Sequence, residues 1–244
     1  MELDSASLKF RRAQYHFNCL KAAYARLQKA SLNKTPTHYK LNPGEEISLE
    51  PSRQPSARWG LIIGDCIQNL RSALDHAVFQ VVPSADRRIY AEKINFPICS
   101  TTTIYDDWKG KNAKWVATVD GKAIRFIDQL QPCDGGNTYP RTHPLWVLHQ
   151  LSNLDKHRRI HVAFAGFDSV SSEEGFVITH VEPQTRVLSL VASTPAEVKV
   201  HLNLTVQIVF QEGEDVADLP VFSTIGLIGK VVAGTINGLR PFMV

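Results

Sequence analysis

The sequence has few cysteines and no pattern that would pair them or bind a metal through them. Four cysteines stand at positions 19, 66, 99 and 133 among 244 residues, and none of them forms a C-x-x-C pair. A zinc knuckle and a thioredoxin-like redox motif are therefore absent. Cys19 and Cys66 fall inside apolar helical patterns, where a free thiol behaves as a small hydrophobic group.

Long apolar runs are missing as well. No segment approaches the ~20 consecutive apolar residues that cross a bilayer. The N-terminal residues MELDSASLKFRR lack the apolar core of a secretory signal. We therefore expect a reduced, cytoplasmic protein that makes no membrane contact.

Neither sign of charge is in large excess. The chain has 27 Lys and Arg against 24 Asp and Glu, a net charge of +3 with histidine neutral. This mild basic bias permits nucleic acid as a partner without arguing for it. Hydrophobic residues make up 43% and charged residues 21% of the chain, which excludes wholesale disorder. The G-x-S-x-G, phosphate-loop and H-E-x-x-H motifs do not occur.

Helical periodicity dominates the first part of the chain. Apolar positions at helical spacing run from Phe10 to Leu27, and a second helix begins after Ser56 and ends near Val82. This second helix is apolar on nearly all sides and is predicted to be the central one. Further helices are predicted from 120 to 130 and from 144 to 158. Residues 34–55 are expected to form a connecting loop. Residues 84–119 give no single pattern, although a proline favours extended chain at 94–98.

The period changes from 3.6 to 2 near residue 159. Strands are expected near 160–165, 175–182 and 185–192, and seven alternating apolar positions from Val198 to Phe210 predict one long strand. Residues 222–238 predict a last helix that returns to the bundle. The sequence therefore predicts an α+β protein, with a helical bundle in 1–158 followed by an antiparallel β-meander and a closing helix in 159–244. We expect the two parts to form one compact domain.

Two polar stripes interrupt the apolar central helix. At 100° per residue, the members of each stripe share a face. The first stripe is Asp65, Asn69, Ser72 and His76, and the second is Gln68, Arg71 and Asp75. Burying an unpaired polar group costs about 1–3 kcal/mol. The stripes therefore indicate internal hydrogen bonds, a solvent-exposed strip or a functional site. Gly60 and Gly64 on the same helix favour close approach of another element.

The pair Arg71 and His76 forms an R-x-x-x-x-H pattern that resembles the motif of the HEPN superfamily, helical-bundle proteins that include metal-independent ribonucleases. The resemblance implies a homodimer that brings two motifs together over RNA, with no metal or other cofactor. His76 would act as acid or base at the ribose 2′-hydroxyl, Arg71 would hold the phosphate, and Asn69 and Asp75 would orient them. Because five residues turn a helix by about 140° from the starting face, we expect convergence through the long arginine side chain or across a dimer interface. A role in defence or stress response is also implied.

A second polar group ends the helix at 144–158. Asp155, His157 and Arg158 either suit the helix C-terminus or meet Asn69 and His76 in one pocket, as supporting residues of the site. The second alternative requires this helix and the central helix to be antiparallel neighbours. The sequence segments 69–76 and 153–158 also resemble segments of bacterial proteins without an assigned activity, which implies a bacterial origin.

Three functional hypotheses follow. The first is a metal-independent endoribonuclease centred on Arg71 and His76. The second is a non-catalytic interaction or structural protein in which the same stripe is an internal network. The third is a metal-dependent hydrolase of the helical-bundle type. For that hypothesis, the spacing of His143, His149 and His157 prevents all three from converging from one helix. A metal site would therefore draw one histidine from each of three helices, as His76 on the central helix allows.

Overall fold

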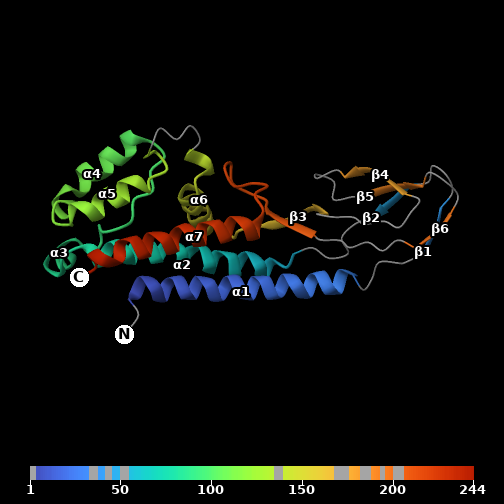
Figure 1. Ribbon diagram of the computed structural model, residues 1–244, viewed down its shortest axis with the longest axis horizontal. Coiled ribbons are helices and arrows are strands. Elements are labelled where there is room, and N and C mark those ends of the chain that lie inside the picture. The colour runs from blue at the N-terminus through green and yellow to red at the C-terminus, as the bar shows by residue number, and fades with distance from the viewer. Residues whose placement is uncertain are drawn as a thin grey trace.

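The chain forms a bundle of helices with antiparallel strands lying beyond one end of it (Figure 1). The structure is a computed structural model that describes residues 4–32, 38–41, 46–49, 55–134, 140–167, 176–181, 188–192, 196–199 and 206–244. The described helices are α1 (Ser5–Leu32), α2 (Ala57–Val81), α3 (Ser84–Tyr90), α4 (Thr102–Val116), α5 (Gly121–Gln129), α6 (Pro144–His157) and α7 (Val221–Leu239). The described strands are β1 (His38–Leu41), β2 (Glu46–Leu49), β3 (Val162–Phe167), β4 (Phe176–Val181), β5 (Leu188–Ala192), β6 (Ala196–Lys199) and β7 (Val206–Phe210).

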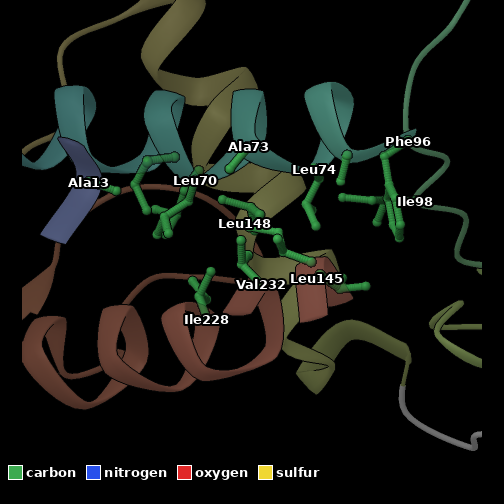
Figure 2. Packing of buried hydrophobic residues seen from close by; sticks show 14 of the residues in the cluster. Ala13, Leu70, Ala73, Leu74, Phe96, Ile98, Leu145, Leu148, Ile228 and Val232 are labelled. Carbon is green, nitrogen blue, oxygen red and sulfur yellow. The ribbon is translucent and has the colours of Figure 1, made fainter. Parts of the chain in front are cut away.

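The central helix is α2, as its nearly continuous apolar sequence predicts. It contacts α1, α6 and α7, and its Leu70 and Leu74 lie in the core with residues of α6 and α7 (Figure 2). Ser56 caps the start of α2, where its hydroxyl accepts a hydrogen bond from the backbone N–H of Arg58 at 3.3 Å. The helix ends just before Pro83, which has no N–H to continue the hydrogen-bond ladder.

The helix α1 runs antiparallel to α2. Near its start, Ser5 contacts His76, and about three turns later His16 contacts Asp65. Between these points the thiol of Cys66 donates a hydrogen bond to a backbone carbonyl of α1 at 3.4 Å. Burial raises the pKa of this thiol to about 12. Cys66 therefore acts as a small core residue, as the sequence predicts.

The helix α6 also runs antiparallel to α2 and approaches it through two glycines. A Cβ atom on Gly60 would lie 2.0 Å from the backbone oxygen of Ile160, just beyond α6. A Cβ atom on Gly64 would lie 2.1 Å from a carboxylate oxygen of Asp155. Both distances are shorter than a van der Waals contact. The close approach predicted from the glycine spacing is therefore confirmed, and so is the antiparallel arrangement of the two helices.

The strands pair antiparallel, in the orders β2-β5-β4, β1-β6 and β3-β7. The predicted antiparallel pairing is confirmed, but the meander is wrong. Among the described strands, only β4 and β5 pair with a neighbour in sequence. Alternation of apolar residues marks a strand and its buried face, but it does not identify the partner.

The connecting loop predicted for residues 34–55 is also wrong. It contains β1 and β2, which pair with β6 and β5. Both strands have only four residues and stand among prolines, which suit short edge strands as well as loops. These pairs cross the predicted boundary at residue 158. Of the long strand predicted from Val198 to Phe210, the structure describes parts in β6 and β7, and residues 200–205 lie outside the described residues.

The region 84–119, where the sequence gives no single pattern, contains two helices. In α4, aromatic side chains at spacings of three and seven residues form one side of the helix. Tyr105 stacks on Trp108, with 5.9 Å between ring centroids, and Trp108 meets Trp115 edge to face at 5.5 Å. The segment 94–99 between α3 and α4 belongs to neither a helix nor a strand, yet Phe96 is fully buried.

The closing helix α7 packs against α1, α2 and α6, as predicted. Among the described residues, Val221–Phe242 is long and apolar enough to cross a membrane, judged by length and composition alone. A core helix of a bundle has the same composition. One such helix among the described residues does not place the protein in a membrane.

Candidate functional site

The second polar stripe of α2 holds the irregular segment 94–99. Arg71 Nη2 donates hydrogen bonds to the backbone oxygen of Phe96 at 2.6 Å and to Asp75 Oδ1 at 3.0 Å. The backbone N–H of Phe96 donates to the same Asp75 oxygen at 2.9 Å. A buried backbone group outside regular structure needs such partners. Arg71 and Asp75 thus satisfy both polar groups of Phe96.

The environment of this pair is largely enclosed. The side chain of Arg71 is 16% exposed, and its Nη1 atom is buried with no hydrogen-bond partner among the described residues. Burial raises the pKa of the Asp75 carboxyl, and the charge of Arg71 opposes this shift. The position of Arg71 is about 140° around α2 from His76. His76 lines a groove beside α1, whereas Arg71 contacts the Phe96 backbone.

Gln68, the remaining member of the second stripe, connects α2 to α6. Its Nε2 atom donates to the backbone oxygen of Ser152 at 3.0 Å and to Asp155 Oδ2 at 3.2 Å. The hydroxyl of Ser152 donates back to Gln68 Oε1 at 3.2 Å. Asp155 therefore meets a polar residue of α2, but that residue is Gln68. The expected meeting with Asn69 and His76 is not observed.

The other supporting residues lie apart from this network. His157 and Arg158 are exposed at the end of α6. Asn69 uses its Nδ2 atom to donate to the backbone oxygen of Asp65, one turn earlier, at 2.7 Å. The predicted site residues therefore do not form one cluster. Arg71 and Asp75 contact Phe96, Asp155 contacts Gln68, and His157 and Arg158 lie at the surface. Asn69 and His76 line a separate groove.

A groove of about 440 Å³ lies between α1 and α2, and we call it the α1–α2 groove. The first polar stripe of α2 supplies Asp65, Asn69 and His76. The facing wall comes from α1, whose polar members share one face at the same spacing of four, three and four residues. They are Ser5, Lys9, Arg12 and His16. Because the helices are antiparallel, two matched polar stripes face each other across the groove.

His76 is the residue of the groove best suited to proton transfer. Its Nδ1 atom lies 3.0 Å from the hydroxyl of Ser5, which also accepts a hydrogen bond from Gln80. Nε2 is therefore the ring nitrogen that can exchange a proton with a bound molecule. Burial lowers the pKa of His76, and the nearby charge of Lys9 lowers it further. Both effects favour the neutral form of the imidazole.

The opposite end of the groove has a different character. His16 Nδ1 lies 3.7 Å from Asp65, whose side chain is largely exposed. Ser5 and His16 are eleven residues apart on α1, so His76 and His16 are separated by roughly 16 Å along the helix. They cannot act on the same bond. The groove therefore has one histidine for proton transfer at the His76 end, with Lys9 and Arg12 following it.

The remaining histidines of α6 do not gather. His143 caps the helix, where its Nδ1 atom accepts a hydrogen bond from the backbone N–H of Leu145 at 3.2 Å. His149 stacks on Trp146 and contacts Asn153 at 3.0 Å. In the part of the chain that the structure describes, no three His, Cys, Asp or Glu side chains come close enough to hold a metal ion.

The contribution of α1 to the site was not predicted from the sequence. The apolar residues from Phe10 to Leu27 predict the helix, but they do not identify its polar face as part of a site. The signal was present in the order Ser5, Lys9, Arg12 and His16, which repeats the spacing of the first stripe on α2. Comparison of the chain with protein-family models, with curated proteins and with solved structures gives no match.

Proposed function

We propose that the α1–α2 groove binds the backbone of single-stranded RNA and that His76 starts its cleavage without a metal ion. The observation that supports this most is the position of a histidine whose neutral form is favoured, in an open groove beside two cations. A neutral imidazole can accept a proton and so act as a general base. Lys9 and Arg12 are the groups that would neutralise phosphate charge.

The proposed reaction is a transfer within the RNA strand. His76 Nε2 removes the proton of a ribose 2′-hydroxyl, and the 2′-oxygen attacks the adjacent phosphorus. The bond from phosphorus to the 5′-oxygen of the next nucleotide breaks, and solvent supplies the proton to that leaving oxygen. The products are a 2′,3′-cyclic phosphate and a 5′-hydroxyl. Lys9 lies one turn from Ser5 on α1, close enough for its charge to lower the pKa of His76.

This proposal gives Arg71 a different role from the one that the HEPN resemblance implies. The contacts of Arg71 with Phe96 and Asp75 occupy its Nη2 atom, and the cations that line the groove, Lys9 and Arg12, are on α1. In our proposal Arg71 is a structural residue, and one chain holds a complete groove. A homodimer that joins Arg71 of one chain to His76 of another is the competing arrangement.

The test is incubation of the purified protein with labelled single-stranded RNA in excess EDTA, followed by analysis of the product ends. The variants are His76→Gln, the double variant Lys9→Gln/Arg12→Gln, and Arg71→Gln. His157→Gln serves as the matched control, because His157 is exposed outside the groove. Circular dichroism establishes that each variant is folded.

We expect the wild type and His157→Gln to cleave equally, with cyclic phosphate ends. Loss of a general base costs about 10²- to 10⁴-fold in rate, so His76→Gln should lose cleavage and retain RNA binding. The double variant should lose binding. Equal cleavage by His76→Gln and the wild type contradicts the proposal, as does RNA that is neither bound nor cleaved. Loss of cleavage in a folded Arg71→Gln variant, with RNA binding unchanged, supports the dimeric arrangement instead.

A further inference from the structure

A second groove lies along α1, between α1 and α7, and we call it the α1–α7 groove. One half of it is apolar, with a volume of about 330 Å³. Its lining is mostly apolar and includes Cys66 and Leu70 of α2, and Gln14 of α1 and the exposed Lys230 of α7 also border it. The apolar wall residues are Phe10, Ala13, Phe17 and Ile225.

The other half of the groove is polar and basic, with a volume of about 340 Å³. It continues directly from the apolar half, because Phe10, Gln14 and Ala233 line both. Arg11 and Arg240 stand on opposite walls of this half. The groove as a whole is therefore amphipathic along its length, with a mostly apolar part bordered by Lys230 at one end and two guanidinium groups at the other.

The charge of the polar half is only partly neutralised. Arg240 Nη2 lies 3.6 Å from Asp4 and donates a hydrogen bond to the hydroxyl of Ser7 at 3.2 Å. Arg11 is exposed and forms no ion pair with any residue that the structure describes. One cation of the pair thus remains available to an anionic group. Guanidinium groups bind carboxylates through two parallel hydrogen bonds.

Two glycines of α7 keep the apolar half open. Gly226 and Gly229 both line it, and a Cβ atom on either would meet nothing within 4 Å. Packing within this chain therefore does not require glycine at these positions. At Gly238 of the same helix, a Cβ atom would lie 2.2 Å from the ring of Phe126. Gly226 and Gly229 thus leave space in the apolar half, and Gly234 is equally open outside the groove.

We propose that the α1–α7 groove binds a fatty carboxylate, with its alkyl chain in the apolar half and its carboxylate between Arg11 and Arg240. On α1 the groove extends from Ser7 to Phe17, ten residues or about 15 Å at the rise of an α-helix. Extended dodecanoate has about this length and the same division into apolar and anionic parts. The proposal is independent of RNA cleavage, because it concerns the other side of α1.

The test is calorimetric titration of the full chain with dodecanoate, below its micelle concentration, beside decanoate and octanoate. Burial of each added methylene should tighten binding about fourfold. Dodecanol, which has no charge, and butyrate, which has almost no chain, should each bind at least tenfold more weakly than dodecanoate. Equal affinity for dodecanoate and dodecanol overturns the proposed role of the arginines.

Two matched pairs of variants locate the site. Gly229→Leu places a side chain in the apolar half from a position where a Cβ atom meets nothing within 4 Å, whereas Gly234→Leu adds the same side chain at an equally open position outside the groove. Arg11→Gln removes the available cation, and Arg88→Gln removes an exposed arginine on α3. We expect Gly229→Leu and Arg11→Gln to weaken dodecanoate binding at least tenfold and both controls to bind as the wild type does.

Light scattering of the same samples distinguishes the other occupant that an apolar groove can take, which is a second copy of the chain. A dimer of the wild type that becomes monomeric in Gly229→Leu, with no binding of dodecanoate to either, overturns the proposal. Unchanged dodecanoate binding in Gly229→Leu also overturns it. Dodecanoate binding that is lost only in the groove variants, with the oligomeric state unchanged, supports it.

Discussion

Replacing Arg71 with leucine should destabilise the fold, because its guanidinium holds the Phe96 backbone and the Asp75 carboxylate. The substitution removes two hydrogen bonds to a charged group, at 2.6 and 3.0 Å. A hydrogen bond to a charged group contributes about 1.5–3 kcal/mol. Asp75 is 33% exposed and regains some hydration, so we expect a loss of about 2–4 kcal/mol.

The assay is urea unfolding followed by circular dichroism, carried out on Arg71→Leu, Asp75→Leu and the double variant. For side chains in direct contact, the coupling energy of such a cycle is about 1–3 kcal/mol. Arg88→Gln, an exposed change on α3, is the control and should stay within about 0.5 kcal/mol of the wild type. A loss in Arg71→Leu as small as in this control would refute the structural role that we assign to Arg71.

Three further predictions follow from the described contacts. Gly60→Ala should lose about 1–3 kcal/mol or more of stability, because its Cβ atom would meet the backbone oxygen of Ile160. Gly234→Ala, at an open position, should gain up to about 1 kcal/mol of stability. Equal urea midpoints for Gly60→Ala and Gly234→Ala would contradict this prediction. The free energy of unfolding should fall as the pH drops below about 6.5. Histidines whose pKa is lowered in the folded protein bind protons less readily there than in the unfolded chain, so acid favours unfolding. Unchanged stability between about pH 7 and 5 would contradict this prediction. These histidines are His76, His143 and His149. Arg12→Gln should reduce the slope of log affinity for single-stranded RNA against log salt by about 0.7, and an unchanged slope would remove Arg12 from the interface.

The sequence predicted the helical part of the fold well because its signals are local. The spacing of apolar residues, Ser56 as a cap and Pro83 as a stop delimit α2, and its apolar character on all sides predicts its central position. Strand partners are not local. Nothing in the alternation near Val198 indicates that β6 pairs with β1, which lies in a segment rich in proline.

The candidate site was predicted in part. The two stripes on α2 are real, and they differ in what covers them. Gln68, Arg71 and Asp75 face irregular backbone and α6, so their hydrogen bonds are internal. Asp65, Asn69 and His76 face the α1–α2 groove. A helical projection gives the angle between two stripes, but only the tertiary structure decides which stripe meets solvent.

The distinction between the two stripes also explains why the motif of Arg71 and His76 did not predict the whole candidate site. Arg71 and His76 belong to one helix but to different faces, and each has its own partners. The basic residues near His76 come from α1, some sixty residues earlier in the chain. They could have been found by searching other helices for a polar stripe with matching spacing.

The most direct test of the account is whether RNA reaches the His76 imidazole. Histidine ring resonances of the ¹⁵N-labelled protein are followed by NMR during titration with a single-stranded RNA that carries 2′-O-methyl groups and cannot be cleaved. His76 is assigned with the folded His76→Gln variant. The account predicts that RNA shifts the His76 Nε2 resonance and leaves exposed His157 unchanged. RNA that binds without affecting His76 would contradict it.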